Sequence, residues 1–480
     1  MEERASKCVD ASPSVSPFMA WGKPDVDPSP SWLHAIASND SSVRSLCVLP
    51  SRAFDEGVQI ALARALRANA VVERLSASGR ALTLASAREF ANAIASNATL
   101  KAVNLGDESF GDASEGTSAL NVVLDGVAAN AGLETIALDG KGVSDSSACA
   151  LARALRGCAT LREISIGRNP ALSGRGLKTA LDGASGAFEA LDASESELDD
   201  DGAEALKGLL SSSKVSMREL SVARCVFTNE GLSALGSGLA ACATLRRLNA
   251  SGVRLGDGGA ATFFARTKDD GVEGELAEID LAECGICEAR DVEALDAFLR
   301  AARRSSAVNL RGNAFGDAGM YVLAAGAFSA RAPQSLDLSS CGLTARAVDA
   351  LKVPLSTSTS LSVFDNPKLG DDGISRLFAA ADASSVSCLD LGAVGLTTNG
   401  LSAIVEALKS AQTFTNLRTL IIGGNPGAQE DSWERLVTNL RGVRPSLDVA
   451  WRAADGGDDS KLQRDAQGRV IGVDNSHGLP

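Results

Sequence analysis

The feature of this sequence that most constrains its fold is a short apolar pattern that occurs fifteen times. Each copy is a triplet with an apolar residue on either side of a central one, as in Ile164-Ser165-Ile166 and Leu336-Asp337-Leu338. From Leu46 to Val449 the intervals between copies run from 25 to 33 residues, with a mean of about 29. A period of this length is typical of repeat architectures, in which one structural unit stacks on the next.

Each triplet alternates with a period of two, which predicts a short β-strand. Between triplets the spacing becomes helical, and Leu232, Leu235 and Leu239 recur at i, i+3 and i+7. One repeat is therefore expected to contain a strand, a loop, a helix and a second loop. In the shortest repeat, Pro354 predicts that the helix ends near Val353, because proline cannot continue a helix interior.

Small polar residues mark two further positions in the repeat. The position three residues after the triplet holds Asn or Cys in half of the fourteen complete repeats, at Asn169, Cys225, Cys284, Asn313, Cys341, Asn366 and Asn425. The position six residues before the triplet does so in five repeats, at Asn69, Asn97, Asn130, Cys158 and Cys242. We expect these side chains to bond backbone groups where the chain turns between layers.

The segment Leu161 to Leu172 reads Leu-x-x-Ile-x-Ile-x-x-Asn-x-x-Leu. It resembles the leucine-rich repeat, and the period near 29 with a full helix resembles the ribonuclease-inhibitor-like subfamily. The resemblance covers residues 43 to 452 and implies an α/β solenoid of about 15 strand–helix repeats. A helix needs about 10 Å where a strand needs about 4.8 Å. The expected solenoid is thus a horseshoe with its parallel sheet concave and its helices convex.

Outside the repeats, composition changes. Residues 1–30 contain Ser12-Pro13, Ser16-Pro17 and Ser29-Pro30 and are expected to form a flexible N-terminal arm. The solenoid is expected to span residues 31–452, with a helical cap around Trp32 to Ile36. Residues 453–480 are expected to form a disordered C-terminal tail.

Charge and composition argue against several classes of protein. A net charge of −14 disfavours nucleic-acid binding, which needs a basic face. No apolar run approaches the 18 residues of a membrane span, and no secretory signal is recognisable, so we expect a cytoplasmic protein without membrane contact. Two histidines, His34 and His477, stand at opposite ends of the chain, which disfavours a histidine-based triad or metal site.

Candidate chemical motifs are weak. Cys284-Gly285-Ile286-Cys287 is a single C-x-x-C, and its first cysteine occupies the repeat position shared by Cys225 and Cys341. Glycine clusters such as Gly256-Asp257-Gly258-Gly259 match no phosphate-binding loop. The sequence therefore predicts no catalytic residues, no cofactor and no metal, and hence a protein that is not an enzyme.

The central residue of each triplet should point out of the core, onto the concave face. Fifteen such residues include four acids and no Lys or Arg, and the residues before the triplets add Glu163, Glu219 and Glu278 but also Arg74 and Arg247. A solvated polar face without a ligand is the structural alternative. The candidate partner-binding residues are Glu163, Asp192, Glu219, Glu278, Asp280, Asp337 and Asp390.

Two functions follow from this surface and the resemblance. The first is a protein-interaction scaffold, monomeric when unbound, that binds a partner with a basic surface on the concave face and adjacent loops. The second is a regulator of a small GTPase, because the chain is also similar to the Ran GTPase-activating protein, which is built from repeats of this length. Arg52 and Arg80 lie in the first two loops after strands, although neither matches a motif of that family.

Overall fold

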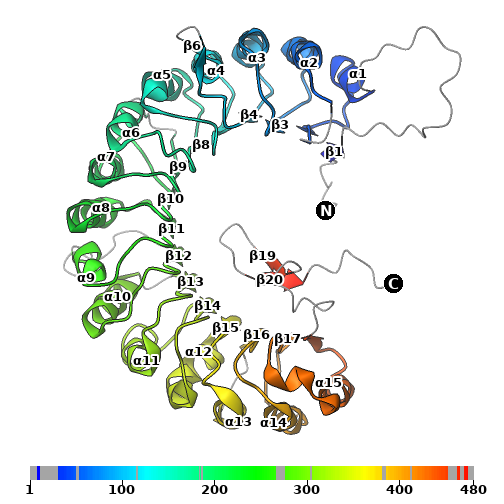
Figure 1. The fold of residues 1–480 in the computed structure, drawn as a ribbon, viewed down its shortest axis with the longest axis vertical. Helices are drawn as coiled ribbons and strands as arrows, with labels where there is room; N and C mark the ends of the chain where they lie inside the picture. Colours follow the sequence, from blue (N-terminus) through cyan, green and yellow to red (C-terminus); the bar gives the residue numbers. More distant parts are fainter. Residues whose placement is uncertain are drawn as a thin grey trace, which may run out of the picture. The chain divides into compact units, whose positions relative to one another are not determined.

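The computed structural model describes residues 8–10, 31–49, 53–114, 117–182, 184, 188–265, 276–302, 305–380, 385–410, 413–451, 462–464 and 470–473. These residues form two compact units, Met1–Ala234 and Leu235–Pro480. Strands and helices alternate in both (Figure 1). In the described residues, a strand lies at every one of the fifteen predicted triplets, seven in the first unit and eight in the second.

The first unit is a parallel sheet with helices on one side. Its strands at the triplets are β2 (Ser45–Cys47), β3 (Arg74–Ser78), β4 (Ala102–Gly106), β7 (Thr135–Ala137), β8 (Glu163–Ser165), β9 (Ala190–Asp192) and β10 (Glu219–Ser221). The helices are α1 (Ser31–Ala37), α2 (Glu56–Ala68), α3 (Leu84–Ser96), α4 (Ala119–Ala128), α5 (Ala148–Gly157), α6 (Gly174–Leu181) and α7 (Asp200–Leu210). Helix α8 (Asn229–Ala241) contains the boundary between the units.

The second unit repeats this arrangement. Its strands at the triplets are β11 (Arg247–Asn249), β12 (Glu278–Asp280), β13 (Ala307–Asn309), β14 (Ser335–Asp337), β15 (Ser360–Ser362), β16 (Cys388–Asp390), β17 (Thr419–Ile421) and β18 (Asp448–Ala450). The α-helices are α9 (Gly259–Phe263), α10 (Ala289–Ala301), α11 (Gly316–Ala325), α12 (Lys352–Thr357), α13 (Gly370–Ala380), α14 (Thr398–Leu408) and α15 (Asp431–Val443). Two 3-10 helices, η2 (Ala345–Leu351) and η3 (Pro426–Gln429), precede α12 and α15.

Neighbouring strands pair in parallel with the central apolar residues of the repeats side by side. In the first unit Ile164 aligns with Leu191, and in the second Val308 aligns with Leu336. The core lies between sheet and helices, where these apolar residues are 3% exposed or less. In Figure 1 the strands of each unit lie on the inner side of an arc and its helices on the outer side, as the different widths of strand and helix require.

The expected asparagine and cysteine positions link successive repeats. The Asn169 side chain donates to the carbonyl oxygens of Leu138 and Ile166, at 2.9 and 2.7 Å, and accepts from the Val143 N–H at 2.9 Å. Equivalent amide contacts to the preceding repeat are made by Asn313, Asn366 and Asn425. At the second marked position, Asn69, Asn97 and Asn130 likewise donate to carbonyl groups of the helix before. The predicted structural role of these residues is confirmed.

The cysteines at the same positions act through their thiols. Cys225, Cys284 and Cys341 donate to the carbonyl oxygens of Ala193, Ala250 and Leu310, at 3.2 to 3.3 Å. Burial raises the pKa of the Cys225 thiol to about 12, and burial likewise raises the pKa values of the Cys284 and Cys341 thiols, which keeps the donor proton in place.

The helix that was expected to end near Val353 continues past Pro354, so that prediction was wrong. The 3-10 helix η2 leads directly into α12, and Pro354 is the third residue of this new helix. Proline is tolerated in a first turn because the N–H that it lacks has no intrahelical partner there.

The expected N-terminal cap coincides with α1, in which Trp32, Leu33 and Ile36 are buried. The expected arm and tail fall mostly outside the described residues. In the expected arm the structure describes β1 (Cys8–Asp10), which pairs in parallel with β2. In the expected tail it describes the antiparallel pair β19 (Leu462–Arg464) and β20 (Val470–Val473). A further two-residue pair, β5 (Ala113–Ser114) and β6 (Thr117–Ser118), lies in the loop before α4.

None of the helices that the structure describes is both long and apolar enough to cross a membrane.

Candidate functional site

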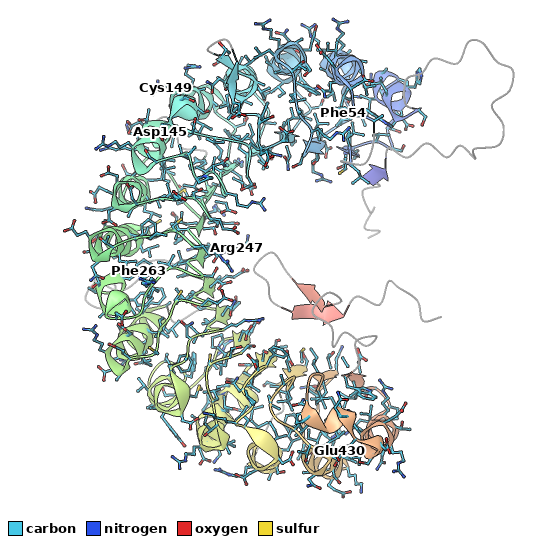
Figure 2. The ribbon with its side chains drawn as sticks, in the orientation of Figure 1. Phe54, Asp145, Cys149, Arg247, Phe263 and Glu430 are labelled. Carbon is cyan, nitrogen blue, oxygen red and sulfur yellow. The ribbon has the colours of Figure 1, made fainter. Side chains whose placement is uncertain are left out.

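We call the side of each sheet that faces away from its helices the sheet face. It is formed by the first and third residues of each strand, while the second residue points into the core. In β9, for example, Leu191 is buried, whereas Ala190 and Asp192 are half-buried on the sheet face. In the second unit, Figure 2 shows Arg247 projecting from the sheet face and Phe263 lying among the helices.

Three of the predicted site residues lie on the sheet face of the first unit. Glu163 is exposed at the start of β8, and Glu219 is half-buried at the start of β10. Asp192 stands between them at the end of β9, and the strand register places it beside Ser165 and Ser221. The Thr135 hydroxyl donates to the Glu163 carboxylate at 3.3 Å. This sheet face therefore presents three carboxylates from three adjacent strands.

The other four predicted residues lie on the sheet face of the second unit. Glu278 begins β12, and the third residues of β12 to β16 form one aligned row in the order Asp280, Asn309, Asp337, Ser362 and Asp390. Adjacent parallel strands are about 4.8 Å apart, so successive aspartates in this row are about 10 Å apart. We call these five residues the polar row.

The aspartates of the polar row also shape the ends of their strands. The Oδ1 atoms of Asp280, Asp337 and Asp390 accept the backbone N–H two residues later, at 3.0, 2.8 and 2.9 Å. Asn309 makes the same contact with the N–H of Arg311 at 3.1 Å. Asp and Asn side chains stabilise turns in this way. Asp280 and Asp390 are accordingly only 5% and 6% exposed, so their charge acts from beneath the surface.

Cationic and aromatic groups interrupt the acidic character of this face. The guanidinium of Arg311 lies 6.0 Å from the centre of the half-buried Phe364 ring. These two residues lie just after β13 and β15, the strands on either side of β14. Arg247 approaches Glu278 at 3.5 Å, which offsets the charge of that carboxylate. The sheet face of the second unit thus combines polar groups with the nearby Phe364 ring, and its acidic character rests mainly on the three aspartates.

Sequence reasoning missed a row of alternating charges at the edge where the strands of the first unit begin. The residue before each strand alternates in sign through Arg44, Glu73, Lys101, Glu134, Arg162, Glu189 and Arg218. Neighbours form ion pairs with N–O distances from 2.5 to 3.4 Å. Comparing this one position across repeats would have revealed the pattern. Because the charges pair within the row, they do not add to an acidic surface.

The structure also describes the surroundings of the C-x-x-C cysteines and of Arg80. Cys284 is buried and Cys287 is exposed, and both are free thiols. Across the described parts of the chain, no three His, Cys, Asp or Glu side chains are grouped to hold a metal ion. The Arg80 guanidinium lies 5.7 Å from the centre of the buried Phe54 ring, a contact within the chain. Arg52 lies outside the described residues.

Comparison with known proteins agrees with this architecture. A family model described as a leucine-rich repeat matches residues 214–236 and 306–324. Together with the repeating strand, turn and helix, this match defines the chain as a leucine-rich repeat protein.

The repeats are of the ribonuclease-inhibitor-like kind. The chain is 31% identical over 234 residues to the ribonuclease inhibitor of Sus scrofa, which covers 48% of this chain and 50% of the relative. It is 28% identical over 198 residues to NACHT, LRR and PYD domains-containing protein 3 of Mus musculus, covering 40% of this chain and 19% of the relative. The chain therefore matches half or less of the length of these two relatives.

Two solved structures match this chain at lower sequence identity. The yeast Rad7 and Elc1 complex contains a chain with a TM-score of 0.39 and 15% identity, over 67% of this chain and 82% of that one. The TLR13–ssRNA13 complex gives a TM-score of 0.44 and 15% identity, over 79% of this chain and 48% of that one.

Proposed function

We propose that this protein is a protein-interaction scaffold that binds a partner protein through the sheet faces. The partner surface is basic, and the main contact is the polar row of the second unit. Glu163, Asp192 and Glu219 of the first unit and Glu278 of the second provide further contacts. In this proposal the protein acts by stoichiometric binding and performs no catalysis.

The observation that carries the proposal is the alignment of Asp280, Asp337 and Asp390 on alternate strands of one sheet. An ion pair at a protein surface contributes only about 0–1 kcal/mol, and Asp280 and Asp390 act from beneath the surface, so a partner must engage several carboxylates together. Regular spacing on paired strands fixes the carboxylates before binding, which lowers the entropy lost in forming those contacts. Phe364 offers an aromatic contact beside them, and phenylalanine is enriched in the cores of protein interfaces.

The name of the relative from Sus scrofa supports the same class of function. A ribonuclease inhibitor acts on a ribonuclease, which is itself a protein, and the repeats of this chain are similar to part of that inhibitor. The similarity favours stoichiometric binding of a protein.

The proposal is tested with a variant that removes charge and keeps the turns. Asp280→Asn, Asp337→Asn and Asp390→Asn together remove three negative charges, while each new amide oxygen can accept the same backbone N–H, as that of Asn309 does. Wild type and variant are immobilised, and proteins captured from cell extract are quantified by mass spectrometry. We expect the variant to capture smaller amounts of the basic proteins that the wild type captures.

A matched control changes three exposed acids on helices of the same unit. Glu293→Gln on α10, Asp372→Asn on α13 and Asp431→Asn on α15 alter the net charge equally but lie away from the sheet face. This control should capture the same proteins as the wild type. If both variants lose capture of basic proteins equally, the effect is one of net charge. If neither variant loses capture, the polar row is not part of the contact surface.

A further inference from the structure

Helix α1 occupies the helix position of a complete repeat at the N-terminal edge of the first unit. The side chain of Asn69, which follows α2, donates to the Ile36 carbonyl of α1 at 2.8 Å. Asn97, which follows α3, makes the same contact with the Leu66 carbonyl of α2 at 2.6 Å. Helix α1 is therefore held one repeat before α2, as α2 is held one repeat before α3.

The strand of this edge repeat comes from the expected arm. Strand β1 pairs in parallel with β2, in the register that aligns Val9 with Leu46 (Figure 1). The sequence Val9-Asp10-Ala11 has the same pattern as the fifteen triplets, with an apolar residue on either side of a central one. The same register aligns Leu46 with Leu75 on β3. The apolar position of the repeats thus continues by one strand beyond β2.

The edge of β2 that faces β1 presents backbone hydrogen-bonding groups. The Val48 N–H donates to the Ser76 carbonyl of β3 at 2.8 Å, so this end of β2 bonds inward through Val48. Successive residues of a strand direct their backbone groups to opposite edges, so Ser45 and Cys47 direct theirs to the outer edge. These are the groups with which an added parallel strand pairs.

Strand β1 is tied to its helix more loosely than any other strand of the sheet that a helix follows. Twenty residues separate Asp10 from Ser31, whereas 4 to 12 residues separate strand and helix in the fourteen complete repeats. Helix α1 keeps its own contacts with the next repeat, because the Asn39 side chain accepts the Ala70 N–H at 2.8 Å in addition to the contact made by Asn69. Strand β1 can therefore leave the sheet without moving α1.

We propose that the outer edge of β2 is a docking site for an extended segment of a protein partner, and that β1 occupies this site as an internal competitor. The partner segment pairs in parallel with β2 and has an apolar residue at the position of Val9, then a polar residue and a second apolar residue. The protein's own segment supplies this pattern. Because α1 already fills the helix position, the site takes a single strand and excludes the strand and helix of a second copy. It is separate from the polar row and recognises its partner by strand pairing.

The test empties the site and offers its occupant as a separate peptide. Val9→Pro removes an N–H and restricts the backbone of β1, so it should release this strand. Val15→Pro is the matched control, because it makes the same change in the expected arm outside β1. A fluorescein-labelled peptide of residues 5–13 is titrated into each protein in reducing buffer, and fluorescence anisotropy reports binding. We expect the Val9→Pro protein to bind at least about tenfold more tightly than the wild type and Val15→Pro, in which β1 competes at high effective concentration.

Two further measurements locate the binding. Ser45→Pro, added to Val9→Pro, removes an N–H from the first residue of β2, where proline is tolerated, and should abolish the binding of the peptide. Hydrogen exchange followed by mass spectrometry should show that residues 44–49 lose protection in the Val9→Pro protein and regain it when the peptide is added.

The proposal is overturned if the Val9→Pro protein does not bind the peptide at about 1 mM, or binds a peptide that itself carries Val9→Pro equally well. Equal binding by the wild type, Val9→Pro and Val15→Pro would also overturn it. If circular dichroism shows that Val9→Pro unfolds the protein, β1 is part of the fold and is not a displaceable competitor. If sedimentation shows that the Val9→Pro protein is a dimer, a second copy takes the edge, which the proposal excludes.

Discussion

Asp200 holds Thr228 of the next repeat with both of its carboxylate oxygens. Oδ1 accepts the backbone N–H at 2.9 Å, and Oδ2 accepts the hydroxyl at 2.5 Å. Thr228 directly precedes α8, so the contact fixes the start of one helix to the start of the helix before it. The same pairing recurs in both units, in Asp145–Ser173, Asp317–Thr344 and Asp371–Thr397.

We predict that Gly231→Ala destabilises the protein because of this contact. A Cβ atom at Gly231 would lie 2.2 Å from the Asp200 Oδ1 atom, so either the helix or the carboxylate must move. We expect a loss of about 1–3 kcal/mol, measured as a shift in the urea unfolding curve. Gly208→Ala is the control, because Gly208 is an exposed residue of α7 with open space at its Cβ position, and it should stabilise by about 0.5–1 kcal/mol. Equal effects of the two changes would contradict the steric explanation.

We predict that Arg168→Gly stabilises the protein. Arg168 has a φ of 56°, in the left-handed region, at a repeat position where Gly140, Gly252 and Gly312 stand in other repeats. A side chain costs roughly 1–2 kcal/mol in this conformation, and glycine does not have this cost. The comparison is with Arg168→Ala, which keeps the Cβ atom. Thermal unfolding should give a higher midpoint for the glycine variant than for the alanine variant, and the reverse order would show that the left-handed backbone is not strained.

The fold was predictable because every repeat carries the same signal. Fifteen triplets with helical spacing between them define the strands and helices independently, so one irregular loop does not alter the assignment. The predicted end of the helix near Val353 was wrong because the sequence does not show that a 3-10 helix ends at Leu351 and that a new α-helix, with its own hydrogen-bond pattern, begins at Lys352. That restart depends on packing against neighbouring repeats.

The candidate site was predictable only in part. Alternation placed Asp280 and Asp390 on the sheet face, but it did not show that they are almost buried and bonded to their own turns. Burial of this kind depends on the residues of adjacent strands.

We predict an alkaline loss of stability that depends on Cys225. The thiol titrates near pH 9.0 in the unfolded chain and near 12 in the folded protein. Between these values the unfolded chain releases the proton first, so the free energy of unfolding falls as the pH rises above 9. Cys225→Ser should lessen this fall by about 1 kcal/mol at pH 10. Ser196, which bonds the Ile166 carbonyl, shows that serine fits this position. Identical pH profiles for the two proteins would contradict the prediction.

Lys141 should have the opposite pH dependence. Its ammonium group is buried and donates to the Ser78 hydroxyl at 2.7 Å and to the Gly106 carbonyl at 2.5 Å. Burial lowers the pKa of Lys141 below its ordinary value of 10.5, although Asp107 and Asp139 oppose the shift. The unfolded chain therefore binds more protons just below pH 10.5, and this residue's contribution to stability rises with pH there. The free energy of unfolding of the wild type, minus that of Lys141→Met, should thus increase as the pH approaches 10.5. A constant difference would show that the ammonium is not penalised by burial.

The central claim is that the polar row binds a basic partner, and the most direct measurement is the affinity of the most strongly captured partner at low and high salt. Titration calorimetry compares the wild type, the triple variant Asp280→Asn, Asp337→Asn and Asp390→Asn, and the helix-side control. We predict that the triple variant binds at least about tenfold more weakly at low salt and that its affinity depends less on salt, whereas the control behaves as the wild type. If the triple variant keeps the wild-type affinity and salt dependence, the polar row is not the binding surface.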